Sequence, residues 1–337
     1  MAGNVYSVCD PEQYRKAGPT DLVELLPPPG GNPLYLQKWL VETLVFAIVH
    51  HEFVHLSGPT GSAKSSLLEA LYTVPENFRG VCDGLGCASR PLKLFPIEMA
   101  TFEAPGELYQ RRALKDGTTY DEPSRLVAAL AAAARCAGSA YPLIWLREIG
   151  RVHSSSVQGG LLNLMTRAEI VLPDGTHFPG QGIAWVADSN YQAEQSATHT
   201  LVTLDDALKR RFTINLTLDY LTAEQEVQVL EHIFNGNGGA PVPAELIVKV
   251  VQLGNVVRRH RSEGNLQTLT PPTIYGYMAF LRTARALPHL SLQQVALATL
   301  LGNAGSEDRK HVAGVFNEVF GLQTEEEEDP TMVGNLF

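Results

Sequence analysis

The residues best suited to chemistry stand together in one short stretch that is rich in small side chains. A loop that wraps a polyphosphate needs small residues, so that its backbone N–H groups can point inward, and a helix N-terminus behind them. It also needs a lysine for the β- and γ-phosphates and a hydroxyl for Mg²⁺, which Lys64 and Ser65 supply. The stretch therefore predicts a loop that binds ATP with Mg²⁺, with Ser65 as the metal ligand. Its residues are Gly58, Pro59, Thr60, Gly61, Ser62, Ala63, Lys64, Ser65 and Ser66.

One position departs from the usual G-x-x-x-x-G-K-[ST] pattern, because Ala63 stands where the second glycine is usual. Alanine loses little at a position with helical backbone angles, and so we expect the loop to tolerate it. The alternative interpretation is a turn rich in glycine and serine that contains Lys64 by chance. A strand before the loop and a helix after it favour phosphate binding.

Apolar patterns predict the elements on either side of the loop. Residues 52–56 form an apolar run that predicts a strand leading into the loop. A helical pattern follows and continues to about Leu71. The loop is thus expected between a strand and a helix, which is the context that a phosphate-binding loop requires.

Two further apolar runs end in polar residues. Residues 141–146 predict a buried strand that is followed by Glu148, and residues 182–187 predict another that is followed by Asn190. Strands that alternate with helices imply a parallel sheet, whose ligand lies at the carboxyl ends of the strands. We therefore expect the loop, Glu148 and Asn190 at one edge of the sheet.

The other elements of the first 220 residues are less regular. We expect a helix that begins at Asn32 and Pro33, and an irregular region between Pro75 and Gly117. The remaining expectations are a strand over residues 92–97, a helix over residues 122–137, a helix around residues 157–165, and a hairpin over residues 168–178 with Asp174 and Gly175 at its turn.

From Leu221 the pattern contains helices only, which marks a second, all-α domain. We expect an α/β fold: a P-loop NTPase parallel sheet flanked by helices, followed by a smaller all-α lid domain. The expected divisions are an N-terminal arm or linker over residues 1–33, a nucleotide-binding domain over residues 34–219, the lid over residues 220–321 and an acidic tail over residues 322–337.

Composition limits the classes of function. The chain has 337 residues, of which 45% are hydrophobic and 18% charged, and this is typical of a globular protein of about two domains. We expect no membrane span, no secretion signal and four free cysteines, and hence a cytoplasmic protein. The net charge of −10 argues against general binding of nucleic acid. A local basic patch at residues 258–261 favours a solvated face or a contact between subunits.

Hydrolysis of a nucleoside triphosphate consists mostly of positioning and charge neutralisation. Glu148, at the end of a buried strand, is placed to orient or deprotonate the attacking water. Asn190, at the end of the next apolar strand, can hold that water or the γ-phosphate. The alternative for Glu148 is a solvated acid or the cap of the following helix.

Taken together, these features resemble an AAA+ ATPase of the MoxR/CbbQ group over about residues 34–320. The motifs that carry the resemblance are the loop 58–66, the strand 143–149 with its acid, the helix around 161–165, the hairpin 169–178, the strand to Asn190 and the sequence Leu208-Lys-Arg-Arg-Phe212. The resemblance implies a ring, with a hexamer as the expected form, that remodels a partner protein as a chaperone does. It also implies that Arg211, or else Arg210, contacts the γ-phosphate of the neighbouring subunit.

The chain departs from the family in two further ways. Arg147 stands where the family has the Asp that completes the Mg²⁺ shell, so we expect weakened handling of Mg²⁺. Pro272 stands where the family's lid arginine touches the γ-phosphate. Slow hydrolysis is the consequence, unless an arginine among residues 258–261 substitutes. Ala63 is also found in the related replicative helicases of the minichromosome maintenance type.

Three functions therefore compete. The first is an ATPase ring that activates or remodels a partner, and the second is a nucleotide-binding scaffold or switch with little turnover, which Arg147 and Pro272 favour. A DNA translocase is a weaker third interpretation, suggested by the helicase-like loop and opposed by the acidic charge. The sequence identifies neither the partner protein nor a residue that selects the base.

Overall fold

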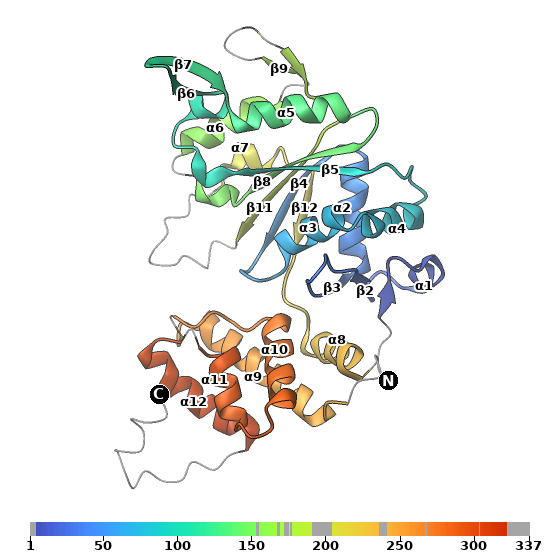
Figure 1. The fold of residues 1–337 in the computed structure, drawn as a ribbon, viewed down its shortest axis with the longest axis vertical. Helices are drawn as coiled ribbons and strands as arrows, with labels where there is room; N and C mark the ends of the chain where they lie inside the picture. Colours follow the sequence, from blue (N-terminus) through green and yellow to red (C-terminus); the bar gives the residue numbers. More distant parts are fainter. Residues whose placement is uncertain are drawn as a thin grey trace. The chain divides into compact units, whose positions relative to one another are not determined.

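The computed structural model describes residues 5–152, 155–166, 169–171, 175, 177–190, 204–235, 241–266, 268–302 and 304–321. The chain divides into two compact units, one over Asn4–Tyr220 and the other from Leu221 onward (Figure 1). The acidic tail expected over residues 322–337 lies outside the described residues, as does Asp174 of the expected hairpin turn.

A five-stranded sheet forms the centre of the first unit. Its order is β12-β4-β11-β8-β5, and every neighbouring pair runs parallel. This confirms the parallel sheet that the sequence predicts. Strand β12 is not among the predicted elements, because its alternation of apolar and polar residues extends over only four residues. The strands are β4 (Phe53–Gly58), β5 (Leu92–Glu98), β8 (Tyr141–Arg147), β11 (Ala184–Asn190) and β12 (Ile214–Thr217).

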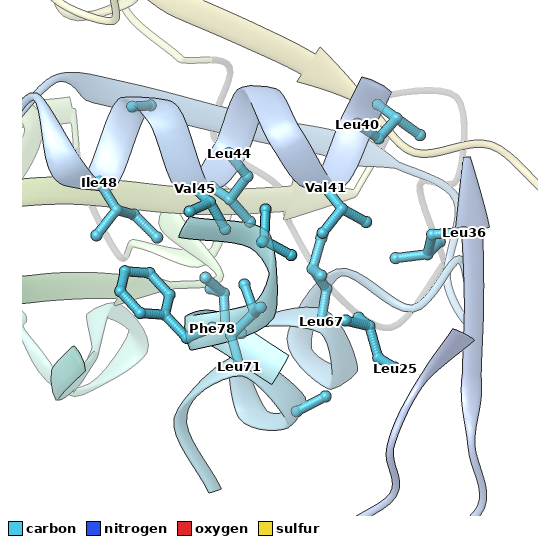
Figure 2. Close-up of a cluster of buried hydrophobic side chains, with 14 of the residues drawn as sticks. Leu25, Leu36, Leu40, Val41, Leu44, Val45, Ile48, Leu67, Leu71 and Phe78 are labelled. Atoms are coloured by element: carbon cyan, nitrogen blue, oxygen red, sulfur yellow. The ribbon is translucent and has the colours of Figure 1, made fainter. Parts of the chain in front are cut away.

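One face of this sheet packs on helices near the start of the chain. Trp145 of β8 and Val186 of β11 belong to this core. Figure 2 shows Ile48 directed toward Phe78 within the same cluster. The helices on this face are α2 (Lys38–Val49), α3 (Lys64–Thr73) and α4 (Pro75–Leu85).

The opposite face has a core of its own. Leu146 and Ala187, which alternate along their strands with Trp145 and Val186, pack there with α5 (Arg125–Cys136) and α6 (Ser155–Thr166). Because both faces are covered, β8 and β11 are continuous apolar runs in the sequence. The expected flanking helices are thus present on both sides.

The N-terminal region differs from the expected arm. Its strands form a sheet in the order β1-β2-β3, in which β2 pairs antiparallel with β3. Asn32 and Pro33, where the helix is expected to start, lie in the connection before β3, and the helix begins only at Lys38. The apolar residues of β2 are buried, which stabilises this arrangement. The elements are β1 (Tyr6–Ser7), α1 (Pro11–Lys16), β2 (Leu22–Leu25) and β3 (Leu34–Gln37).

The region expected to be irregular contains more structure than its sequence suggests. Besides α4 and β5 it holds η1 (Met99–Thr101), η2 (Pro105–Leu108) and an antiparallel hairpin of β6 (Gln110–Lys115) and β7 (Thr118–Pro123). Helix α5 starts after this hairpin at Arg125, because the hydroxyl of Ser124 accepts the N–H of Val127 and caps it.

The hairpin predicted over residues 168–178 is confirmed by the antiparallel pairing of β9 (Glu169–Val171) with β10 (His177–Pro179).

The second unit contains helices only in its described residues, as the sequence predicts. They share one core, which includes Val251, Phe280 and Phe316. The helices are α8 (Ala223–Asn235), α9 (Ala244–Ser262), α10 (Ile274–Ala286), α11 (Leu292–Thr299) and α12 (Ser306–Phe320). Among the described residues, no helix of either unit has the length and apolar character needed to span a membrane.

Asn77 joins the N-terminal sheet to the helices of the first unit. Its side chain is 0% exposed, accepts the N–H of Leu26 at 2.8 Å and donates to the carbonyls of Leu26 and Ala70 at 2.9 and 3.0 Å. We predict that Asn77→Ala lowers the free energy of unfolding by about 3 kcal/mol, because it leaves buried backbone groups without partners. Urea unfolding measures the loss. Arg79→Ala, on the exposed side of the same helix, is the control, and an equal effect of both variants would contradict the prediction.

Candidate functional site

The glycine-rich stretch forms the turn between β4 and α3, in the position that the sequence predicts. At Gly58 a Cβ atom would lie 2.0 Å from the backbone oxygen of Leu218, so only glycine fits. Gly61 has a φ of 80° in the left-handed region. The hydroxyl of Tyr220 donates to the carbonyl of Thr60 at 2.7 Å and anchors the loop at its most exposed part.

Ala63 does not have the helical backbone that we expect. Its φ and ψ are 72° and 14°, which is the left-handed conformation. An alanine there costs about 1–2 kcal/mol relative to a right-handed conformation. The expectation that alanine is tolerated because the position is helical is therefore wrong, and the loop contains local strain.

Lys64 lies inside the loop and is only 6% exposed. Its Nζ donates to the carbonyls of Gly58 at 2.9 Å and Pro59 at 2.8 Å, and to the hydroxyl of Ser62 at 3.3 Å. The ammonium is therefore centred in the turn, where phosphate oxygens are the natural alternative acceptors. Ser65 and Ser66 follow in the first turn of α3 and are partly buried.

The strand register brings the other predicted residues to the same sheet edge. Asn190, the last residue of β11, pairs with Gly58, which begins the loop. Ala187 pairs with Leu146, so β8 ends beside β11, and Glu148 follows it directly. The loop, Glu148 and Asn190 thus lie at one edge, in the arrangement that the alternation of strands and helices predicts.

Glu148 has a strained backbone. Its φ of 52° and ψ of 50° are left-handed, and such strain in a residue other than glycine is common at functional sites. Its side chain is 40% exposed, and its Oε2 lies 3.3 Å from Nη1 of Arg151 in η3 (Ile149–Arg151). The carboxylate is therefore accessible to water.

Asp188 is a residue to which the sequence assigns no role. It is 5% exposed, and Nε1 of Trp145 donates to its Oδ1 at 2.6 Å. Burial raises the pKa of Asp188, whereas this bond, a bond from the backbone N–H of Glu148 and the nearby charge of Lys64 act in the opposite direction. Its position directly after an apolar run is the signal that could have identified it.

Arg147, expected to disturb Mg²⁺ binding, is turned toward the edge strand β5. Its Nη1 donates to Oε1 of Glu98 at 2.6 Å, and its guanidinium lies 4.7 Å from the centre of the Trp145 ring. Its charge is therefore balanced by a carboxylate of the protein and by an aromatic face.

Arg210 and Arg211 are exposed at the end of α7 (Asp206–Lys209). Phe212 is buried next to them, with its ring centre 5.4 Å from that of His55 on β4. In the described part of the chain, no hydrogen bond or ion pair joins either arginine to the phosphate loop. The structure of one chain therefore places both arginines at the surface.

All three arginines that were candidates to replace the lid arginine lie on α9, and two of them are bonded to other residues of the second unit. Nη2 of Arg258 lies 2.7 Å from Oε1 of the buried Glu226 and donates to the carbonyl of Pro272 at 2.8 Å. Burial raises the pKa of Glu226, and Arg258 opposes this. Arg261 donates to the carbonyl of Leu266 at 3.0 Å. Arg259 is the exposed one of the three.

All four cysteines are free. Within the described ranges, no group of three or more His, Cys, Asp or Glu side chains is arranged to hold a metal ion.

Comparison with known proteins gives distant structural likenesses. No protein-family model matches the chain, and no curated protein matches it either. A candidate ATPase of Cytophaga hutchinsonii ATCC 33406 is similar in structure with a TM-score of 0.38 and 14% identity, over 85% of this chain and 89% of that one. A structure of the HORMA:CdnC:Trip13 complex of E. coli MS115-1 has a chain with a TM-score of 0.38 and 15% identity, over 82% and 77%. At these scores the likeness carries no argument about function.

The strain at Ala63 can be tested by one substitution. We predict that Ala63→Gly raises the free energy of unfolding by about 1 kcal/mol, because glycine adopts the left-handed conformation without steric cost. Ala70→Gly, within helix α3, is the matched control and lowers stability by about 1 kcal/mol. Urea unfolding measures both. A loss of stability in Ala63→Gly similar to that in Ala70→Gly would show that residue 63 is not strained.

Proposed function

We propose that this chain is an AAA+ ATPase of the MoxR/CbbQ type, which binds ATP with Mg²⁺ between the subunits of a ring and remodels or activates a partner protein. The observation that carries the proposal is the set of residues at one sheet edge. A lysine-bearing loop leads from β4 into α3, Asn190 ends the neighbouring strand β11, and Glu148 follows β8, the next strand in the order β4-β11-β8.

The loop has the features that a bound triphosphate requires. The close approach of Gly58 to Leu218 leaves no room for a side chain, and Lys64 has its ammonium inside the turn. On binding, Lys64 exchanges loop carbonyls for phosphate oxygens, while the N-terminus of α3 adds its partial positive charge. Ser65 would hold Mg²⁺, which neutralises charge on the phosphates when bound.

Glu148 and Asn190 then act on water. The left-handed backbone of Glu148 turns the chain sharply after β8, and its exposed carboxylate orients or deprotonates the attacking water. Asn190 lies next to Gly58 in the register and holds that water or the γ-phosphate. Both roles need only the hydrogen-bonding groups that these side chains carry.

The proposal of a ring rests on Arg211, with Arg210 as the neighbouring alternative. Both are exposed beside a buried Phe212, which fixes the backbone that carries them. An exposed arginine can contact the triphosphate of an adjacent subunit, and such a contact is worth a large factor in rate. We propose a hexamer on the strength of the family resemblance, and we leave the partner protein unnamed.

A nucleotide-binding switch with little turnover is the second candidate. It is favoured by Arg147, which occupies the end of β8 and pairs with Glu98 instead of offering a carboxylate. Arg258 also supports it, because this arginine is held by Glu226 within the second unit. Such a chain would bind ATP and change its assembly without rapid hydrolysis.

Removal of the loop lysine tests nucleotide binding. We predict that Lys64→Ala weakens the affinity for ATP by about 30- to 100-fold, because a charge-assisted contact to the phosphates is lost. Titration with a fluorescent ATP analogue measures the change. Lys93→Ala, which removes an exposed lysine of β5, is the control and leaves the affinity unchanged. Equal affinities of Lys64→Ala and the parent would contradict the proposed loop.

Glu148→Gln distinguishes the ATPase from the switch. For an ATPase we predict that phosphate release falls about 100- to 1000-fold while ATP affinity stays the same, because the amide cannot take a proton from water. The exposed Glu69→Gln of α3 is the control for a lost surface charge. Equal, near-zero rates for the parent and Glu148→Gln would instead support the switch and reject the ATPase.

A further inference from the structure

Asp188 lies one strand away from Arg147 and at the same level of the sheet. Ala187 of β11 pairs with Leu146 of β8, so the next residues, Asp188 and Arg147, are neighbours in the register. Asp188 also pairs with Leu56 of β4, two residues before Gly58. It therefore lies on the strand between the phosphate loop and Glu148 (Figure 1).

The side chain of Asp188 belongs to the α3 face of the sheet. Side chains two residues apart on a strand share a face, and Val186 packs in the core that includes Leu67 of α3. Nε1 of Trp145, another member of this core, donates to Asp188. Because α3 begins at Lys64 and Ser65, the carboxylate and the start of the phosphate-binding helix are on the same side of the sheet.

Arg147 does not balance this acid. Its guanidinium is paired with Glu98 on the opposite side of β8 from β11. Among the described residues, no ion pair reaches Asp188, although Lys64 is near enough to stabilise its charge. A carboxylate that is 5% exposed and lacks an ion pair favours a cation beside it.

From this geometry we propose that Asp188 supplies, from β11, the carboxylate that holds the Mg²⁺ ion of a bound nucleotide, directly or through its water shell, together with Ser65. Oxygen ligands from one or two carboxylates and a nucleotide are what Mg²⁺ prefers. The inference rests on the proposed nucleotide binding. It also changes the expectation for Arg147, since the acid missing from the end of β8 is replaced at the same register of the next strand.

The test measures metal binding and not turnover. Asp188→Asn keeps the shape of the side chain and its acceptor for Trp145 but removes the charge. The affinity for a fluorescent ADP is measured in EDTA and in saturating Mg²⁺, and Mn²⁺ binding to the ADP complex is measured by electron paramagnetic resonance. Asp116→Asn, at the exposed turn between β6 and β7, is the matched control.

We expect Asp188→Asn to bind ADP in EDTA as the parent does and to bind Mn²⁺ about 10- to 100-fold more weakly. The increase in ADP affinity that Mg²⁺ gives the parent is smaller in Asp188→Asn by the same factor. Asp116→Asn behaves as the parent does. Unchanged Mn²⁺ binding in Asp188→Asn overturns the inference and leaves the acid as a support for Trp145 and Glu148. A parent chain that binds no ADP in EDTA overturns the proposed function, and this inference with it.

Should Asp188→Asn not fold, Asp188→Glu takes its place, because it retains the charge and shifts the carboxylate by one methylene. It is expected to weaken Mn²⁺ binding about tenfold or more with ADP affinity in EDTA unchanged. Mn²⁺ binding equal to that of the parent contradicts the inference in this variant as well.

Discussion

The hydrogen bonds of the Lys64 ammonium are the interaction on which the site depends. A lysine that is 6% exposed must find acceptors for its charge, and the carbonyls of Gly58 and Pro59 provide them. The chain can bring those carbonyls around the lysine only by a tight turn, and Gly58 permits this because a side chain there would meet Leu218. The conformation of the loop is thus held by the protein's own contacts.

The site also contains backbone strain, which the surrounding sheet maintains. Ala63 and Glu148 both have left-handed backbones, and both lie at the carboxyl edge of the parallel sheet. Strained residues persist where rigid neighbours determine the path of the chain. Here those neighbours are β4 and β8, whose residues pack against the two cores of the first unit.

Much of the fold follows from local sequence patterns, and the remainder depends on contacts distant in sequence. Strands β8 and β11 are visible as continuous apolar runs because both of their faces are covered, and β4 and β5 are visible from their apolar residues between turns. The sequence does not reveal β12 or the N-terminal sheet, since their strands have four residues or fewer and are defined by pairing with segments elsewhere in the chain. The backbone of Ala63 is likewise hidden, because a turn and not residue type sets its φ.

The site residues also divide into those visible in local sequence and those set by contacts distant in sequence. The loop, Glu148 and Asn190 could be predicted, because each ends a recognisable strand, whereas the relation of Asp188 to Arg147 exists only in the register of β11 with β8. Arginine at the end of β8 implies a weakened metal site when it is considered alone. In the structure, however, the ion pair with Glu98 balances the charge of Arg147, and the buried Asp188 on the next strand adds a carboxylate at the same edge.

The most direct test of nucleotide binding at this loop is a crystal structure of the chain with a non-hydrolysable ATP analogue and Mg²⁺. The account predicts that the triphosphate lies in the turn 58–65, with Lys64 Nζ bonded to its β- and γ-phosphates in place of the carbonyls of Gly58 and Pro59. An analogue bound elsewhere, with Lys64 still bonded to both carbonyls, would contradict it.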